Sequence, residues 1–484
     1  METYKRREPQ NTIIHKLIQE HYPQFAADHP GFPQYVYRTF EAFQDCGDLA
    51  KGFMRTKCSQ CDEELVVAFS CKKRGFCSSC GAKRASETAG HLVDNILPHT
   101  RCRQIVLTLP FPLRFWCATN KTLLNRIYKT LKEALFRNLN FKAEQKGIKK
   151  PAFGSITWIQ NWGSGLNLAP HFHVLLMESA WESTNKEQPI LRNLPEWTNM
   201  DLEEVIHEVL TKTIKYLKKK GYLNESEEIV ENPAMDSLFQ DHDDLTNSLQ
   251  ASLHNQVAFG ADAGRYVTRI GSGFGYREEI PVMKGRLCLS QNGFSIHGAR
   301  VIRTNDREGL EQLVSYMARP AISVERLSMT PEGYVQYALK KRWHDGTEAL
   351  EFTPMDFLSR LAALVPPPRV HMIKYAGIFA PNHPIRNKVI LNPGVKKGKP
   401  SKCEDVEAGE ENRKKVKNSS WARLLRRVFQ IDVGSCSKCG GEMEIMGAIF
   451  DREQAKRYLD HVGLARPPPE TSPPAELNTV YLPL

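Results

Sequence analysis

Pro170-His171-Phe172-His173-Val174-Leu175 lies near the middle of the chain and decides its expected fold. In an extended strand, successive side chains point to opposite faces. Phe172 and Val174 then face a core, whereas His171 and His173 project together from the other face. Two imidazoles side by side on a rigid strand supply half of a divalent-metal site. The alternative is a half-buried strand whose wet face carries two polar residues.

The segments around this strand predict an α+β fold with a central antiparallel β-sheet and flanking helices. A strand over residues 103–110, a basic amphipathic helix over 119–145, and strands over 155–160 and 170–177 follow one another. This order suits an antiparallel sheet with helices on one face. Further elements are expected as helices over 10–45, 85–96, 200–221 and 306–318, and as strands over 286–289, 294–301, 335–340 and 349–352.

We expect four parts in the chain: an N-terminal helical and zinc-binding domain (1–98), a catalytic domain (99–380), a flexible basic linker (381–420) and a small C-terminal module (421–484). An acidic insertion over about 178–255 interrupts the catalytic domain, with a poorly ordered stretch around 224–244. The insertion either covers a DNA groove as a charge mimic or forms a solvated surface, and the second interpretation is favoured.

Charge and composition indicate a partner and a compartment. The net charge is +11, and residues 178–244 hold 16 acidic against 7 basic groups, so the rest of the chain is more basic still. Such an excess favours nucleic acid as partner. No stretch approaches 18 uncharged apolar residues, and the N-terminus does not resemble a signal peptide, so we expect a cytoplasmic, nucleoid-associated protein without a membrane segment. Twelve cysteines in such a chain favour metal over disulfides.

Cys58-x2-Cys61-x15-Cys77-x2-Cys80 has the spacing of a structural four-thiolate zinc site. Cys46 and Cys71 are spare and could each replace one ligand. The neighbouring Lys72, Lys73 and Arg74 suggest contact with DNA, although a purely structural role is nearly as well supported. Cys436 and Cys439 form half of a second site, whose other ligands, Cys403 among the candidates, stay open.

Tyr316 is the candidate nucleophile. Asn305 can cap a helix whose buried stripe is Leu310, Leu313, Val314 and Met317, and Tyr316 falls on the flank of that stripe, beside Arg319 and Arg326. A tyrosine with a solvated hydroxyl would look the same. The hydroxyl titrates near ~10, so a histidine-bound cation that polarises a phosphate would help it to attack. Attack leaves a covalent phosphotyrosine that conserves the bond energy for rejoining.

Motifs in one order between about residues 20 and 450 resemble a known family. They are listed here: Cys58–Cys80; Gln160-Asn161-Trp162-Gly163, Leu166-Asn167-Leu168 and His171-Phe172-His173; Ser315-Tyr316-Met317-Ala318-Arg319-Pro320; Leu361–Val370; and Trp421–Phe429. The chain resembles the rolling-circle insertion-sequence transposases of the His-hydrophobic-His (HUH) nuclease superfamily. The resemblance implies an N-terminal zinc domain, a catalytic antiparallel sheet, and cleavage and rejoining of single-stranded DNA at element ends and target.

The resemblance also implies roles for single residues. His171 and His173 would bind Mg²⁺ or Mn²⁺, and Tyr316 would form a 5′-phosphotyrosine. Some members carry a second tyrosine four residues earlier, where this chain has Gln312, so it looks like the single-tyrosine, common-region branch. The second strand transfer would then need reuse of Tyr316, a second subunit in a homodimer, or another nucleophile.

Several points stay open at the level of sequence. Gln160 and His297 are candidates for a third metal ligand, and Ala169 stands where related families have a histidine. Tyr334 and Tyr337 are expected to be structural. A plasmid relaxase or replication initiator would use the same chemistry, but the zinc module and the lack of a phosphate-binding helicase motif favour the transposase. A non-catalytic zinc-dependent DNA-binding regulator is the remaining alternative.

Overall fold

A computed structural model of the chain describes residues 11–182, 188–270, 286–392 and 434–464. The described residues form two compact units: unit 1 holds residues 45–70 and 434–464, and unit 2 holds residues 11–44 and those between 71 and 392. The charged part of the expected linker, the Trp421–Phe429 motif and Cys403 lie outside the described residues. The division differs from the four expected parts, because segments from both ends of the chain share unit 1.

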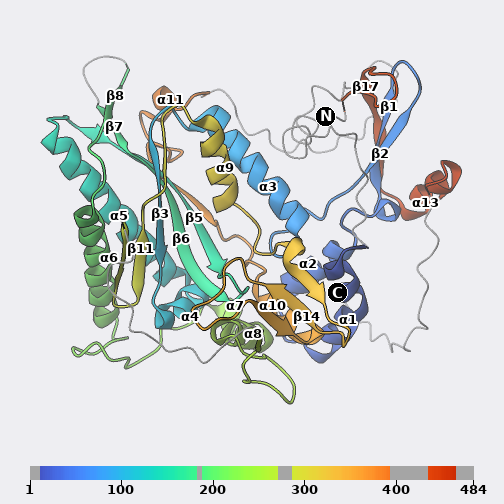
Figure 1. Cartoon of the computed structure of the whole chain (residues 1–484), viewed down its shortest axis with the longest axis horizontal. Helices are drawn as coiled ribbons and strands as arrows, with labels where there is room; N and C mark the ends of the chain where they lie inside the picture. The colour runs from blue at the N-terminus through green and yellow to red at the C-terminus, as the bar shows by residue number, and fades with distance from the viewer. Residues whose placement is uncertain (1–10, 183–187, 271–285, 393–433, 465–484) are drawn as a thin grey trace. The chain divides into compact units, whose positions relative to one another are not determined.

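Unit 2 is built on an antiparallel sheet, as the sequence predicts (Figure 1). Its strands run in the order β10 (Cys288–Gln291), β11 (Phe294–His297), β3 (Cys102–Thr108), β6 (Leu168–Met177), β5 (Gly154–Trp162) and β16 (Ile373–Gly377), and β12 (Val301–Ile302) also pairs with β3. All of these pairings are antiparallel. The histidine-bearing strand β6 therefore lies in the interior of the sheet, between β3 and β5.

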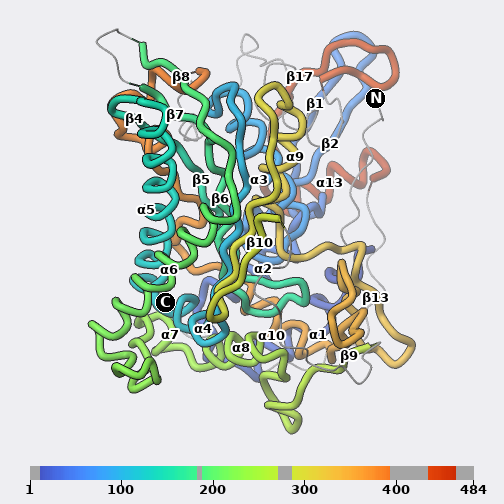
Figure 2. The backbone as a smooth tube through the Cα atoms, turned by 60° about the vertical axis from the view of Figure 1, so that its left-hand side comes forward, coloured from blue at the N-terminus to red at the C-terminus, as the bar shows by residue number. Residues whose placement is uncertain are grey.

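Helices cover both faces of this sheet, so the expectation of helices on one face is wrong (Figures 1 and 2). One face carries α4 (Phe111–Thr119), α5 (Lys121–Gln145) and α6 (Asn199–Lys219), and the other carries α3 (Ser78–His91), continued by a π turn over Leu92–Ile96, and α9 (Arg307–Met317). The physical reason is that β6 has buried apolar side chains on both of its faces, so neither face is left to solvent. Phe172 and Val174 enter one core, and Leu175 and Met177 enter the other.

The expected acidic insertion contributes to the first core. Helix α6 matches the predicted helix over 200–221, and its Leu202, Val205 and Val209 are buried. A buried ion pair of 2.9 Å joins Lys142 of α5 to Asp201 of α6. This helix is therefore a packed layer and not only a solvated surface. The stretch expected to be poorly ordered contains turns and the short helix α7 (Ser237–Gln240), followed by α8 (Asp243–His254).

The remaining elements of unit 2 form smaller layers. The helices are α1 (Ile13–Asp28), α2 (Gln34–Gln44), α10 (Pro354–Ala363) and α11 (Arg386–Val389). A second antiparallel sheet has the order β13 (Leu327–Met329), β14 (Val335–Ala338), β15 (Ala349–Phe352) and β9 (Thr268–Ile270), and a third has the order β4 (Pro151–Ala152), β7 (Ser179–Glu182) and β8 (Ile190–Asn193). The predicted strands over 335–340 and 349–352 thus lie outside the central sheet.

The described part of unit 1 contains a small sheet packed against an α-helix. Strand β1 (Phe53–Cys58) pairs with β2 (Glu64–Ala68) on one side and with β17 (Met443–Ile449) on the other, and α13 (Arg452–His461) follows β17. Phe53 and Val66 of the sheet pack on Ala455 and Leu459 of the helix. The core of unit 1 therefore draws on both terminal regions.

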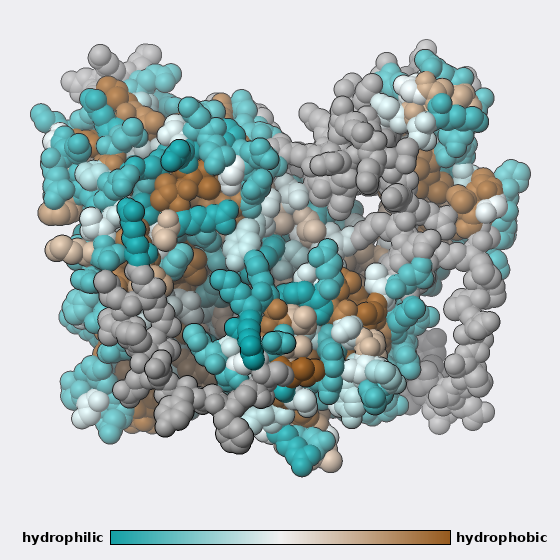
Figure 3. Space-filling view, viewed as in Figure 1, coloured by the Kyte–Doolittle hydropathy of each residue, from teal (hydrophilic) through white to brown (hydrophobic). Residues whose placement is uncertain are grey.

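A helix that crosses a bilayer must be both long and apolar. Among the described residues, every helix is too short or too polar to cross a membrane. On the face shown in Figure 3, hydrophobic residues occur as separate patches among hydrophilic ones.

Candidate active site and cysteine groups

His171 and His173 lie on one face of β6, as the alternation predicts. Their Nε2 atoms are 3.1 Å apart. Across the sheet, His173 stands between Val106 of β3 and Trp158 of β5 in register, and His171 stands opposite Gln160. Only 5 % of His173 is exposed. The pair is therefore held by strands on both sides rather than displayed on a loop.

The outer nitrogen of each ring has a partner that orients it. Nδ1 of His171 lies 2.7 Å from the carbonyl oxygen of Ala169, so Nδ1 donates and Nε2 keeps a lone pair. The Gln104 side-chain amide nitrogen donates to Nδ1 of His173 at 3.0 Å. Turning this amide by 180° would present its oxygen instead, so that Nδ1 donates and the Nε2 lone pair is free for a cation. Such outer partners are typical of histidines that bind metals.

Both imidazoles are neutral at physiological pH. Burial lowers the pKa of His173 to about 3, with a further contribution from His171 and from the charge of Arg319. Burial is also the main reason why the pKa of His171 is lowered, and Arg319 and Arg114 add to it. A neutral ring is the form that binds a cation.

Gln160, a candidate third ligand, lies next to the pair, whereas His297 does not. The Gln160 amide nitrogen donates to the Met317 carbonyl oxygen at 2.6 Å, which leaves its buried Oε1 without a hydrogen-bond partner among the described residues. Such an orphan oxygen costs about 1–3 kcal/mol unless something binds it. His297 is exposed on β11, opposite Val106, so two strand spacings, roughly 10 Å, separate it from His173.

Tyr316 faces the histidines from helix α9. Its ring centroid lies 6.2 Å from that of His173, with the two planes perpendicular. The stripe formed by Leu310, Leu313, Val314 and Met317 is buried, which leaves the half-buried Tyr316 at its edge as predicted. The helix begins at Arg307, and Asp306 caps it through Gly309, so the expected cap at Asn305 is wrong by one residue.

Positive charge surrounds the Tyr316 hydroxyl. The guanidinium carbon of Arg319 lies 4.0 Å from the ring centroid, and the Lys340 ammonium lies 5.4 Å from it. Burial by itself would raise the pKa of Tyr316, but a hydrogen bond from Arg319 and the charges of Arg319, Lys340 and Arg300 together lower it. The environment thus favours the phenolate. Sequence reasoning found Arg319 but missed Lys340, Arg300 and Gln104, which come from separate strands and loops.

The other predicted DNA-binding residues have different surroundings. Arg326 stacks on Tyr337 at 4.4 Å and donates to its hydroxyl, so it supports a fully buried ring. Arg74 donates to the carbonyl oxygens of Val370 and Pro367, at 2.7 and 3.0 Å. Lys72 is exposed and Lys73 is half-buried. Of these four residues, only Lys72 presents a largely free side chain.

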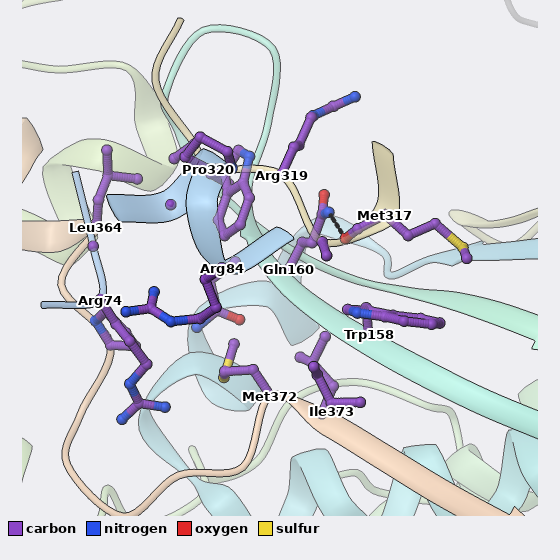
Figure 4. A pocket seen from close by; sticks show the side chains of 18 of the residues that line it. Arg74, Arg84, Trp158, Gln160, Met317, Arg319, Pro320, Leu364, Met372 and Ile373 are labelled. Atoms are coloured by element: carbon purple, nitrogen blue, oxygen red, sulfur yellow. Dashed lines mark hydrogen bonds between the residues drawn. The ribbon is translucent and has the colours of Figure 1, made fainter. Parts of the chain in front are cut away.

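A cavity of about 140 Å³ opens along β5, the strand next to β6 (Figure 4). Trp158 and Gln160 form its floor on β5, and Met317 and Arg319 approach from the end of α9. The Trp158 indole N–H is buried and has no acceptor among the described residues. The cavity therefore combines an aromatic surface with an unused donor and, on Gln160, an unused acceptor. The further lining residues drawn in Figure 4 include Arg74, Arg84, Pro320, Leu364, Met372 and Ile373.

The cysteines fall into two groups, which differ from the single predicted set. In unit 2, Cys77 and Cys80 lie with Cys71, and in unit 1, Cys58 and Cys61 lie with Cys436 and Cys439. Within each group, the sulfurs lie within 4.8 Å of one another. The two Cys-x2-Cys turns of the single predicted set thus belong to different groups. The spare Cys71 joins the first group, and the C-terminal half-site joins the second.

Comparison with known proteins yields two family matches. Residues 154–387 match the family described as "Putative transposase", and this range holds the histidine pair and Tyr316. Residues 17–109 match the family described as "Transposase zinc-binding domain", of the IS91 type. No curated protein and no solved structure gave a significant match. Two separate segments of the chain thus match transposase families, one holding the histidine pair and Tyr316 and the other an IS91-type zinc-binding domain, which supports a role as a DNA-processing transposase that binds DNA.

Proposed function

We propose that unit 2 cuts and rejoins single strands of DNA at the ends of a mobile element, with Tyr316 as the nucleophile. The observation that carries the proposal is the perpendicular approach of the Tyr316 ring to His173, 6.2 Å between centroids, on one face of the sheet. A phenol lies there beside two neutral imidazoles and under the charge of Arg319. These groups together suit phosphoryl transfer, whereas a purely structural role would not require them to meet.

The proposed step exchanges one phosphodiester for another. The Tyr316 oxygen attacks the phosphorus of the scissile phosphodiester, and the bond from phosphorus to the 3′ oxygen breaks. The phenolic proton passes to solvent, and the leaving oxygen takes up a proton to become a 3′ hydroxyl. The 5′ phosphate stays on Tyr316 until another 3′ hydroxyl attacks it, which releases the tyrosine and joins the strands. Arg319 and Lys340 favour the phenolate that attacks.

Three side chains fit a divalent cation at this position. The Nε2 atoms of His171 and His173 would bind it, and the unpartnered Oε1 of Gln160, which stands opposite His171 in register, would join them. Two ligands at about 2.1 Å and at right angles lie about 3.0 Å apart, which agrees with the observed Nε2 separation of 3.1 Å. When bound, Mg²⁺ or Mn²⁺ would polarise the phosphate and offset the charge that builds on its oxygens.

An arginine at the cavity supports a single-stranded substrate. Proteins that bind single strands neutralise the phosphate backbone with arginine and lysine side chains. Arg319 lines the cavity, whereas Trp158 and Gln160, 3 % and 2 % exposed, are too buried to stack on a base. Lys72, exposed on the same unit, adds charge for the flanking nucleotides.

The proposal includes one nucleophile per chain. Gln312, one turn before Tyr316, is exposed and cannot form a phosphoester of this kind. The second strand transfer then falls to Tyr316 again or to a second subunit. A non-catalytic DNA-binding regulator would leave the cationic surroundings of Tyr316 and the orphan oxygen of Gln160 without a use. A relaxase or initiator would share the site, and the family match favours the transposase.

The test uses the full chain with Mn²⁺ and single-stranded oligonucleotides from the ends of the element. We expect a protein–DNA adduct that survives denaturation and is lost in Tyr316→Phe. Tyr334→Phe is the matched control, because Tyr334 is exposed in the turn between β13 and β14. His171→Ala with His173→Ala should abolish the adduct at unchanged zinc content. An adduct that persists in Tyr316→Phe would refute the assignment.

A further inference from the structure

The second cysteine group is formed by two segments far apart in the sequence. Cys58 ends β1 and Cys61 follows it, whereas Cys436 and Cys439 precede β17, and all four belong to unit 1. The Sγ atoms of Cys58 and Cys439 are 3.5 Å apart, and so are those of Cys61 and Cys436. Four thiolates at about 2.3 Å from a tetrahedral ion lie about 3.8 Å from one another, close to these distances.

The two turns present their sulfurs in the same way. Each sulfur accepts a backbone N–H from the residue two positions later: Gln60 to Cys58, Lys438 to Cys436 and Gly441 to Cys439, each at 3.4 Å, and Glu63 to Cys61. These bonds stabilise negative charge on all four sulfurs. Two unrelated segments have adopted one geometry, with the sulfurs directed at a common point.

Glycines make the C-terminal turn possible. Gly440 has φ +75°, which favours glycine. A Cβ on Gly441 would lie 2.9 Å from the Cys58 sulfur. The C-terminal turn is therefore built for close approach to the N-terminal one.

We infer that Cys58, Cys61, Cys436 and Cys439 bind a structural zinc ion of their own, in addition to the zinc of the remaining cysteine group. Four sulfurs with no open position select Zn²⁺ over Mg²⁺ or Mn²⁺, which prefer oxygen. This site lies half outside the matched zinc-binding segment, which ends at residue 109. The ion would fasten β17 to β1, next to the paired residues Cys58 and Met443. The inference does not depend on the proposed strand transfer.

The test counts zinc in the purified full chain by plasma mass spectrometry. We expect two zinc ions per wild-type chain and one in Cys436→Ser with Cys439→Ser. The matched control is Cys288→Ser, a half-buried cysteine of β10 outside both groups, which should keep two. Cys436→His should also keep two, since histidine ligates zinc, and it separates loss of a ligand from loss of folding.

A cobalt-substituted protein gives an independent readout. Each tetrahedral thiolate site contributes visible absorption bands, so the double serine variant should lose about half of the intensity. Zinc that stays at two in the double serine variant, or at one in the wild type, would overturn the inference. Adduct formation with DNA measured on the same samples tests the catalytic proposal separately, because its residues belong to unit 2.

Discussion

Replacing Arg319 by alanine tests whether electrostatics prepare Tyr316 for attack. The guanidinium carbon lies 4.0 Å from the Tyr316 ring centroid and its N–H groups donate to the hydroxyl. A hydrogen bond to a charged group contributes about 1.5–3 kcal/mol, and each 1.4 kcal/mol changes a rate about tenfold. We therefore expect adduct formation to slow by roughly 10- to 150-fold at pH 7 in Arg319→Ala.

The pH dependence gives the sharper result. Arg319 lowers the pKa of Tyr316, so its removal raises that pKa and reduces the phenolate fraction at any given pH. The alkaline rise of the single-turnover rate should move to higher pH in Arg319→Ala, and less so in Arg319→Lys. Arg326→Ala is the control, because Arg326 contacts Tyr337 instead. A rate reduced equally at every pH would refute the reasoning and leave Arg319 as a DNA contact only.

Two further predictions concern stability and packing. Because burial holds the pKa of His173 at about 3, the unfolded chain binds one more proton between that value and ~6.5, and the free energy of unfolding should fall by up to about 1.4 kcal/mol per pH unit as pH decreases through this window. Urea unfolding without added Mg²⁺ or Mn²⁺ should show this slope in the wild type and a smaller one in His173→Gln; equal slopes would mean that the ring is already hydrated. Gly81→Ala should destabilise unit 2 by about 1–3 kcal/mol and slow adduct formation, because its Cβ would lie 2.5 Å from that of Pro320, next to Arg319. Ser79→Ala on the same helix should do neither in the same assays.

Local sequence patterns were enough to predict the strand and the helix that hold the site residues. The alternation in β6 predicted the shared face of His171 and His173, and the helical stripe of α9 predicted Tyr316 at its edge. Both are properties of a few consecutive residues. The sequence did not predict the second helical layer. Leu175 and Met177 make one face of β6 apolar enough to be buried, but His171 and His173 lie on the same face and made it look solvent-exposed.

Long-range partners were beyond local patterns. The spacing from Cys58 to Cys80 suits one zinc site, and nothing in it reveals that Cys61 lies beside Cys436, 375 positions away. Gln104 and Lys340 are likewise ordinary polar residues in sequence, and only strand pairing and the approach of separate loops bring them to His173 and Tyr316. The positions of these side chains depend on strand pairing and on contacts between distant segments, which the local composition does not reveal.

The shared strand pairing of unit 1 has a consequence for synthesis. On a ribosome, β1 and β2 emerge long before β17, and at about 5–20 residues per second the interval is roughly 20 to 80 s. During that interval the nascent chain exposes one edge of β1 and a bare apolar surface at Phe53 and Val66. Only translation that continues through α13 can close this surface, so a product terminated before it would carry an open, aggregation-prone edge and be removed by proteolysis.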